Sequence, residues 1–365
     1  MITSLAITAL VFLGIRILVI LINTGFYFRS SGKLYRGTQM ISILVPARNE
    51  EVHLPRLLDD LLGQDYKDYE VWVCDDHSTD RTPAILEDYS KRHPHIRWFP
   101  ATTLKEGWTG KNAACYQLAQ KAGGSILLFL DADMRISGDI LIRLSGYLEG
   151  KSLKLLSVFP KQLMESTGEK ATVPVMNWIL LSLLPLPMVY YSPRRSFAAA
   201  NGQFMMFQAP TYHKLQPHAI LRFSPVEDIG IMKLYKKEHY RCTTLLGDDR
   251  VSCRMYTGYR EAIEGFSKNV LHFFSESRLW LFFFVLFSTF GLPVTALWSV
   301  PVFLIALGAA LLGRMLISRI SNQPVIRNLW MIPWQHVSFL HMVWTALKHK
   351  SQGSLQWKGR QIKLT

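Results

Sequence analysis

The sequence predicts an α/β domain with a mostly parallel central sheet, flanked by transmembrane helices at both ends of the chain. Two observations lead to this fold class. Short β-branched runs alternate with segments of helical periodicity in the middle of the chain, a pattern typical of parallel βαβ units. Long apolar stretches with few charges are confined to the two ends. We expect four segments: an N-terminal membrane anchor at 1–28, an α/β domain at 38–275, a membrane hairpin at 279–318, and an interfacial or re-entrant segment with a basic tail at 328–365.

The composition favours a membrane protein. The chain has 365 residues, of which 49% are hydrophobic and 19% charged, below the roughly 25% charged residues of soluble globular proteins. Its 41 Lys and Arg against 27 Asp and Glu give a formal net charge of +14. An ordinary cytosolic enzyme, a disordered chain or a histone-like nucleic-acid binder does not combine these values, whereas a protein with basic segments against an anionic membrane leaflet does. The four cysteines form no C-x-x-C pair, which argues against a zinc site or a disulfide framework and fits a reducing cytosol.

The first apolar segment, residues 5–28, is long enough for a membrane-spanning helix, which takes about 20 residues. No basic stretch precedes it and no A-x-A site follows it, so an uncleaved anchor is favoured over a secretory signal. An aromatic belt at residues 26–28 is followed by Arg29 and Lys33, and the positive-inside rule then puts the following chain in the cytoplasm. Arg16 costs about 2.5–3.5 kcal/mol at mid-depth. We expect it to pair with another helix or to shift the register of the span.

The second apolar block, residues 279–313, is too long for one straight span. Pro293 and the segment 299–301 offer breaks, which predicts two helices of about 16–18 residues. Basic residues on both sides put both flanks in the cytoplasm, as a two-span hairpin requires. Residues 329–347 are rich in Trp and contain Pro333, which favours an interfacial or re-entrant segment. We expect three spans plus an interfacial helix, with a fourth span as the open alternative.

Each element of the middle segment follows from its periodicity and its end signals. Residues 41–47 form a β-branched apolar run, typical of a buried strand. Leucines at helical spacing before Gly63 predict a helix, and Thr82-Pro83 gives an N-cap followed by a proline in the first turn. In chain order we expect a strand at 41–47, a helix at 50–63, a strand at 71–74, helices at 82–93 and 111–122, and a strand at 125–130. Ligands bind at the carboxyl ends of the strands in such sheets.

Polar residues gather at those strand ends, in the order 46–51 (PARNEE), 75–80 (DDHSTD) and 131–133 (DAD). Two carboxylates one residue apart suit a hard divalent cation such as Mg²⁺ or Mn²⁺, which proteins hold by one or two carboxylates together with substrate phosphate oxygens. Lys111 opens a helix, where an anionic phosphate is favoured. A further acidic pair, Glu227-Asp228, precedes an amphipathic run. Each signal alone is common, but the ordered set on these strand ends is specific.

This ordered set resembles the catalytic domain of glycosyltransferase family 2, which has the GT-A nucleotide-sugar-binding fold, over about residues 40–275. The resemblance implies that the uracil of a UDP-sugar is held by Pro46, Ala47, Arg48, Asn49, Glu50, Asp75 and Asp76. It also implies that Asp131 and Asp133 contact the ribose and bind the metal, Mg²⁺ or Mn²⁺, on the diphosphate. By the same resemblance, Asp228 is the catalytic base.

Further residues complete the expected site. Lys111 and Lys268 are expected to stabilise the leaving diphosphate, and a positive-inside anchor residue is the open alternative for Lys268. Gly202, Gln203 and Glu227 are expected on the acceptor side. A hydroxyl acceptor needs a base, whereas an ionised carboxylate acceptor does not.

A closer resemblance, to the membrane glycosyltransferases of carotenoid and hopanoid biosynthesis and especially to the diaponeurosporenoate glycosyltransferase type, extends over nearly the whole chain. It is carried by residues 107–111 (GWTGK), 114–117 (ACYQ), 202–204 (GQF), 254–256 (RMY), 264–268 (EGFSK) and 357–361 (WKGRQ). The Q-x-x-R-W signature of processive polysaccharide synthases is absent, with 265–269 (GFSKN) near its place. The pair Glu227-Asp228 is not kept by every carotenoid-type relative, which leaves the acceptor open.

The resemblance implies inverting, non-processive transfer of a sugar from a UDP-sugar to a lipidic acceptor such as a carotenoid or other isoprenoid, by a multi-pass protein of the plasma membrane with a cytoplasmic catalytic domain. The alternatives are a polyisoprenyl-phosphate glycosyltransferase, a polysaccharide synthase, and a nucleotide-binding scaffold without turnover. Two interpretations of the apolar residues 175–191 stay open: buried core, or a membrane-dipping helix that lines an acceptor groove. The basic residues flank the apolar segments, so nucleic acid is not needed as a partner to explain the net charge.

Overall fold

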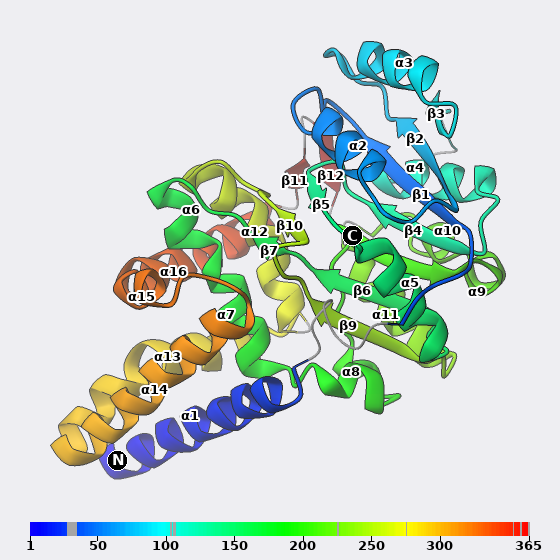
Figure 1. Cartoon of the computed structure of the whole chain (residues 1–365). Coiled ribbons are helices and arrows are strands. Elements are labelled where there is room, and N and C mark those ends of the chain that lie inside the picture. Colours follow the sequence, from blue (N-terminus) through cyan, green and yellow to red (C-terminus); the bar gives the residue numbers. More distant parts are fainter. Residues whose placement is uncertain are drawn as a thin grey trace. The chain divides into compact units, whose positions relative to one another are not determined.

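The computed structural model describes residues 1–27, 35–102, 104, 107–224, 226–274, 276–352, 354–357 and 360–363, and from residue 351 onward the backbone only. The chain divides into two compact units (Figure 1). Unit 1 comprises residues 1–27, 162–185 and 255–365, and unit 2 comprises residues 28–161 and 186–254. Residues 162–185 thus belong to the unit of the terminal helices, and the four segments expected from the sequence stay a prediction. The basic anchor residues Arg29 and Lys33 lie outside the described residues.

Unit 2 is built on a seven-stranded sheet. The strands lie in the order β3 (Ile96–Pro100), β2 (Tyr69–Asp75), β1 (Ile41–Ala47), β4 (Ile126–Leu130), β8 (Phe204–Gln208), β6 (Leu155–Phe159) and β9 (Cys242–Leu246). Neighbours pair in parallel except for β8, which is antiparallel to both β4 and β6. β1 and β4 are apolar and buried along nearly their whole length, as expected for strands covered on both faces. The predicted fold class, α/β with a mostly parallel sheet, is confirmed.

The remaining elements of unit 2 are α2 (Leu54–Leu62), α3 (Thr82–Arg92), α4 (Gly110–Lys121), β5 (Met134–Ile136), α5 (Ile140–Gly150), α8 (Pro187–Tyr191), the 3-10 turn η1 (Arg195–Phe197), α9 (Ala209–Leu215), α10 (Pro217–Ile220), α11 (Glu227–Lys237) and β10 (Val251–Cys253), with β7 (Lys161–Gln162) where the chain passes into unit 1. The helix expected from residue 50 begins only at Leu54. The N–H groups of Glu50 and Glu51 donate instead to Thr82 Oγ1 (2.8 Å) and Asp80 Oδ2 (3.1 Å). The stretch before α2 is therefore a loop that is tied to the loop after β2.

Unit 1 contains the apolar helices. Its elements are α1 (Ile2–Gly25), α6 (Thr167–Thr172), α7 (Pro174–Leu183), α12 (Tyr259–Phe273), α13 (Arg278–Trp298), α14 (Val300–Ile320), α15 (Val325–Trp330), α16 (Ile332–Gln352), β11 (Ser354–Trp357) and β12 (Arg360–Lys363). Within the described chain, α1, α13 and α14 are the three helices long and apolar enough to cross a membrane, and they pack side by side (Figure 1). This agrees with the expected three spans and suggests membrane association. Ser299 separates α13 from α14, whereas Pro293 lies inside α13 and does not end it.

Polar side chains of α1 bind α7. Arg16 is 7% exposed and donates to Ser182 Oγ from Nε (3.1 Å) and Nη2 (2.9 Å). Asn23 Nδ2 donates to the backbone carbonyls of Leu181 and Leu184 (2.9 Å each) near the end of α7, where carbonyls lack helical partners. Arg16 therefore pairs with another helix, the first of its two expected outcomes. The apolar segment 175–191 is divided: α7 packs on α1 within unit 1, and α8 belongs to unit 2.

Candidate active site

The PARNEE segment lies where β1 ends. Pro46 and Ala47 are the last residues of β1 and stand opposite Cys74 and Asp75 of β2. The register of β1 with β4 stops at Leu44, so the missing N–H of Pro46 leaves no bond of that ladder unmade. A proline therefore fits this central strand at the point where the chain leaves the sheet and enters the site loop.

The loops after β1 and β2 are bound to each other. Asn49 (φ 53°) and His77 (φ 55°) both adopt the left-handed conformation, which turns the chain sharply just after each strand. The N–H of Asn49 donates to Ser78 Oγ (2.9 Å), and the N–H of Thr79 donates back to Asn49 Oδ1 (2.8 Å). Asn49 thus links the two loops.

Arg48 lies against the acidic pair at the end of β2. Its Nη1 donates to the backbone carbonyl of Asp76 (2.8 Å) and lies 3.8 Å from Asp76 Oδ2. The residues Asp75 and Asp76 are only 5% and 8% exposed. Asp75 Oδ2 accepts from the N–H of Ser78 (3.4 Å), but Asp75 Oδ1 is buried with no hydrogen-bond partner among the described residues. A buried acceptor without a donor is costly unless a ligand supplies one.

Lys111 is the cation at the centre of a second group. It lies in the first turn of α4, whose N-cap Thr109 accepts from the N–H of Asn112 (3.3 Å). Its Nζ lies 2.9 Å from Asp131 Oδ1 and 3.3 Å from Glu227 Oε1. Although burial lowers the pKa of Lys111, these two carboxylates raise it well above its usual value. The side chain therefore stays charged.

Asp133 is held by two neighbours in this group. Gln203 Nε2 donates to Asp133 Oδ2 (3.2 Å), and Cys253 Sγ lies 3.3 Å from the same oxygen. Burial first, and the nearby Asp131 carboxylate second, raise the pKa of Asp133 to about 6. Sequence reasoning missed Cys253. Cys253 reaches the site because β10 pairs with β5 and places Cys253 opposite Met134. The sequence around Cys253 contains no pattern that predicts this pairing.

Asp228 lies in the first turn of α11. Its Oδ2 accepts from the N–H of Gly202 (3.1 Å) and its Oδ1 from the N–H of Ile229 (2.7 Å). Burial first, and the adjacent Glu227 second, raise the pKa of Asp228 to about 7, against the two hydrogen bonds and Lys111, which lower it. A carboxylate poised near neutrality can take or give a proton under cellular conditions.

Unit 2 thus brings nearly all the predicted site residues together. The first group comprises Pro46, Ala47, Arg48, Asn49, Glu50, Asp75 and Asp76, and the second comprises Lys111, Asp131, Asp133, Gly202, Gln203, Glu227 and Asp228. The charge of Glu50 contributes to the raised pKa of Asp133, which links the two groups electrostatically. Lys268 lies on α12 in unit 1 and belongs to neither group. The roles of all these residues stay predictions.

The residues present fit a hard divalent cation that is shared with a ligand. The described part of the chain contains no group of three or more His, Cys, Asp or Glu side chains placed to hold a metal by themselves. Asp131 and Asp133 offer two carboxylates, and the buried Gln203 Oε1 has no hydrogen-bond partner among the described residues. Mg²⁺ and Mn²⁺ are commonly held by one or two carboxylates plus phosphate oxygens of the substrate. This donor set is of that kind.

Comparison with known proteins gives a consistent picture. Residues 42–177 match the family described as glycosyl transferase family 2. The chain is 27% identical over 249 residues to the 4,4'-diaponeurosporenoate glycosyltransferase of Staphylococcus haemolyticus, a match that covers 67% of this chain and 65% of that one. It is 31% identical over 176 residues to the beta-monoglucosyldiacylglycerol synthase of Nostoc sp., with 46% and 36% covered. The chain therefore spans less than two thirds of the length of these curated relatives.

A solved structure shares the fold. The mannosyltransferase PcManGT from Pyrobaculum calidifontis, solved in complex with GDP-Man and Mn²⁺, superimposes with a TM-score of 0.56 at 17% identity, over 96% of this chain and 100% of that one. At this level of identity the likeness establishes the fold alone. With the strand-end motifs of β1, β2 and β4, it shows that the chain has the GT-A fold. The family match places residues 42–177 of this fold in glycosyltransferase family 2.

Proposed function

We propose that this protein is a membrane-bound, inverting, non-processive glycosyltransferase that moves a sugar from a UDP-sugar to a lipidic acceptor such as a carotenoid or other isoprenoid. One observation carries the proposal. A near-neutral carboxylate, Asp228, shares a partly buried site with the cation of Lys111 and with the pair Asp131 and Asp133. A base, a cation for a leaving diphosphate and a metal-ligand pair are the three parts that transfer from a nucleotide sugar requires.

The donor base would bind in the first group. Asp75 Oδ1 is a buried acceptor without a donor, so an N–H of a nucleobase would satisfy it. The guanidinium of Arg48 is fixed by the Asp76 carbonyl and presents a flat, charged surface for a base to stack on. The assignment of uracil rests on the family resemblance, and we keep it as part of the proposal.

The diphosphate would bind between the two groups. Lys111 would lie against its oxygens, and Asp131 and Asp133 would hold Mg²⁺ or Mn²⁺ there. When bound, such an ion neutralises the charge that develops on the leaving diphosphate. We keep Lys268 as a predicted second cation.

The proposed chemical step uses Asp228. The acceptor hydroxyl loses its proton to the Asp228 carboxylate as its oxygen bonds to the anomeric carbon. The bond from that carbon to the diphosphate oxygen breaks on the opposite face, and its electron pair leaves with UDP, which inverts the configuration. Gly202 and Glu227 border the Asp228 carboxylate, and Gln203 lies one residue further along. We propose these residues for the acceptor side.

The lipidic acceptor is supported by the three apolar helices and by the names of the two relatives, which refer to a diaponeurosporenoate and a diacylglycerol. We further propose a plasma-membrane protein with three spans and a cytoplasmic catalytic domain, because the basic residues flanking the apolar segments satisfy the positive-inside rule in that orientation.

The test is an assay in membranes that contain the full chain. Radiolabelled UDP-glucose or UDP-galactose is added with and without Mn²⁺, and label is counted in the lipid extract while UDP release is measured. We expect metal-dependent labelling that Asp228→Asn abolishes. Glu238→Gln, an exposed change at the C-cap of the same helix, should leave it intact. Full turnover in Asp228→Asn on a hydroxyl acceptor rejects the base assignment. If the chain binds UDP-sugars but releases no UDP from any donor tested, it is a nucleotide-binding scaffold and not a transferase.

A further inference from the structure

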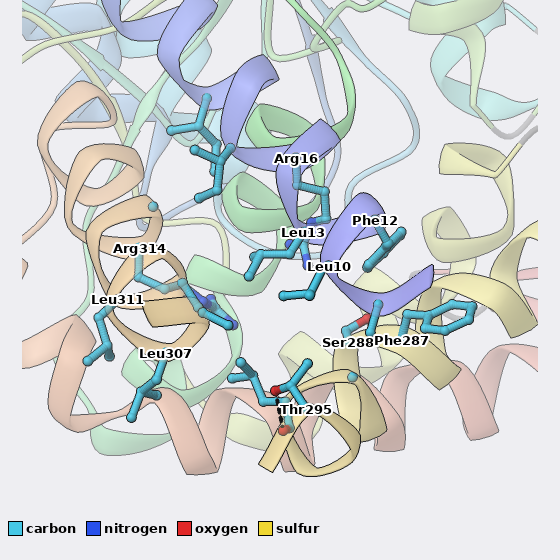
Figure 2. Close-up of a pocket in the computed structure, with 18 of the residues that line it drawn as sticks. Leu10, Phe12, Leu13, Arg16, Phe287, Ser288, Thr295, Leu307, Leu311 and Arg314 are labelled. Atoms are coloured by element: carbon cyan, nitrogen blue, oxygen red, sulfur yellow. Dashed lines mark hydrogen bonds between the residues drawn. The ribbon is translucent and has the colours of Figure 1, made fainter. Parts of the chain in front are cut away.

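A cavity of about 150 Å³ lies inside unit 1 (Figure 2). Its walls come from α1, α13 and α14, with Trp178 of α7 and Ile332 of α16 completing it. Most lining side chains are apolar, among them Leu10, Leu13 and Leu307. The lining contains none of the site residues of unit 2 named above. It does include Trp178 of the segment 175–191, for which the sequence left buried core and an acceptor groove as alternatives.

Two arginines reach into this cavity from different helices, Arg16 from α1 and Arg314 from α14 (Figure 2). Both guanidinium groups lie over the same indole: their Cζ atoms are 4.7 and 4.0 Å from the ring centre of Trp178. The two cations are therefore close together. Arg16 also lies 4.9 Å from the ring centre of Phe284, so aromatic rings form one wall of the charged end.

The protein satisfies only part of the hydrogen-bonding capacity of these two side chains. Among the described residues, Arg16 donates twice to one oxygen, Ser182 Oγ, and Arg314 makes one long bond, to Gln335 Oε1 (3.5 Å). Each guanidinium carries five N–H donors in a planar fork. Most of the donors at the charged end of the cavity are thus free to bind a guest.

Among the described residues, no carboxylate forms an ion pair with either arginine. The sequences of α1, α7, α13, α14 and α16 contain neither Asp nor Glu. An arginine at membrane depth costs about 2.5–3.5 kcal/mol, and two cations that share one ring also repel each other. Charges in such surroundings are normally paired, so an anion bound from outside the chain would stabilise both arginines.

We propose that this cavity binds the anionic end of a membrane lipid: a carboxylate or phosphate carried on an apolar chain. An oxyanion matches the planar forks of Arg16 and Arg314, and bonds of this kind are among the strongest that proteins make. The proposal assumes that the three apolar helices lie in the membrane. It does not depend on the transfer reaction.

The shape of the cavity suits such a molecule. Along α14 its lining runs from Ala306 to Arg314, about 12 Å at the helical rise. The charges lie at one end of this run, and Leu307, Ala310 and Leu311 line the rest, which gives the site a polar head end and an apolar tail end. A volume of about 150 Å³ holds an oxyanion and the first few carbons of a chain, since an apolar cavity of that size accommodates benzene.

The test uses the full chain in nanodiscs of phosphatidylcholine. A radiolabelled, photoactivatable palmitate is titrated, and cross-linking to α14 peptides is quantified. We expect saturable labelling that unlabelled palmitate and lysophosphatidate suppress, and that hexadecanol, which has the chain without the charge, does not. Inorganic phosphate and acetate, which have the charge without the chain, should also fail to compete. Equal competition by hexadecanol, or by the free ions at the same concentrations, overturns the lipid-anion assignment.

Variants locate the site. Arg16→Gln and Arg314→Gln should each weaken palmitate binding by about tenfold or more, because each removes one charged partner. Arg319→Gln, an exposed arginine on the same helix α14 that does not line the cavity, is the matched control and should bind as the unmodified chain does. Unchanged binding in both cavity variants overturns the proposal.

A second pair of variants tests the proposal if the arginine variants fail to fold. Ala310→Phe fills the apolar end of the cavity without touching either charge, whereas Ala309→Phe adds the same ring at a neighbouring position outside the lining. We expect palmitate binding to be lost in Ala310→Phe and retained in Ala309→Phe. Equal binding by the two variants contradicts a lipid seated in this cavity.

Discussion

The backbone N–H of Gly202 donates to Asp228 Oδ2 at 3.1 Å, which joins the stretch before β8 to the first turn of α11. The second oxygen of Asp228 accepts from the N–H of Ile229 (2.7 Å). Both bonds favour the ionised carboxylate, yet burial and the neighbouring Glu227 outweigh them and raise the pKa of Asp228 to about 7. The carboxylate is thus fixed in position and close to half-ionised at neutral pH, as a general base should be.

The first prediction concerns the pH dependence of transfer. Because a base acts in its ionised form, kcat/KM for a hydroxyl acceptor should rise with pH and level off above about 7, the pKa of Asp228. Initial rates between pH 5 and 9 at saturating metal measure this. A carboxylate acceptor, which needs no base, should lack this limb. A flat profile with a hydroxyl acceptor counts against Asp228 as the base.

The second prediction concerns stability. An acid whose pKa is higher in the folded chain than in the unfolded one stabilises the fold at low pH and loses that contribution as pH rises through its folded pKa, here from 3.8 towards about 7. Asp228→Asn removes the buried negative charge. At pH 8 it should raise the free energy of unfolding by about 1–3 kcal/mol, with little change below pH 4.

Thermal melts of both proteins at pH 4 and pH 8 check this. Glu238→Gln, at the exposed C-cap of the same helix, should melt like the unmodified chain at both pH values. If Asp228→Asn is inactive but more stable than the unmodified chain at pH 8, the Asp228 carboxylate lowers stability and is needed for function. An equal or lower melting temperature for Asp228→Asn at pH 8 contradicts the raised pKa.

The third prediction concerns Gly202. A Cβ at this position would lie 3.2 Å from Glu227 Oε1 and 3.3 Å from Lys111 Nζ, closer than most real Cβ contacts. Gly202→Ala should shift these two charged groups and lower kcat by about tenfold or more, because small misplacements in a reacting site are costly. Gly258→Ala, whose Cβ would meet nothing within 4 Å, is the control. Unchanged kcat in Gly202→Ala shows that the close approach does not matter for turnover.

The fourth prediction concerns the metal. Asp133→Ala removes one of the two carboxylates proposed to hold Mg²⁺ or Mn²⁺, so metal-dependent UDP binding should weaken by about tenfold or more. Calorimetric titration of UDP with and without Mn²⁺ measures it. The exposed Asp249→Asn should leave both titrations unchanged. If Asp133→Ala binds UDP with the same Mn²⁺ dependence as the unmodified chain, Asp133 is not a metal ligand.

The sequence predicts a structural feature well when the residues that determine it are neighbours in the chain. β1 and β4 came out within one residue of the expected strands because buried parallel strands are continuous apolar runs with polar ends. The strand-end carboxylates followed from the same topology. The helix expected from residue 50 begins only at Leu54. The preceding N–H groups of Glu50 and Glu51 donate to Thr82 Oγ1 and Asp80 Oδ2, about 30 residues further along the chain, and such distant partners cannot be predicted from local periodicity.

Long-range pairings were beyond the sequence. β8 lies antiparallel between β4 and β6, and β10 places Cys253 beside Asp133. Neither strand pairing can be predicted from the periodicity of the residues in the strand itself. Arg16 was recognisable as an expensive charge in an apolar helix. Its partner Ser182, however, lies 166 residues away. The indole that it shares with Arg314 belongs to Trp178, which is similarly distant in the sequence. Periodicity predicts which face of a helix is buried and cannot say against what.

The last prediction separates the two tasks of Lys111. This cation lies 2.9 Å from Asp131 and 3.3 Å from Glu227, and its charge lowers the pKa of Asp228. Lys111→Met should therefore raise the pKa of Asp228 and move the rising limb of the pH profile to higher pH. If Lys111 also stabilises the leaving diphosphate, kcat on the plateau should fall by about 10²–10³-fold. Lys121→Met, an exposed lysine at the other end of α4, is the matched control and should change neither the limb nor the plateau. If the rising limb of the pH profile shifts but kcat on the plateau is unchanged, Lys111 affects only the pKa of Asp228 and does not stabilise the diphosphate. If the rising limb does not shift, Lys111 does not affect the pKa of Asp228.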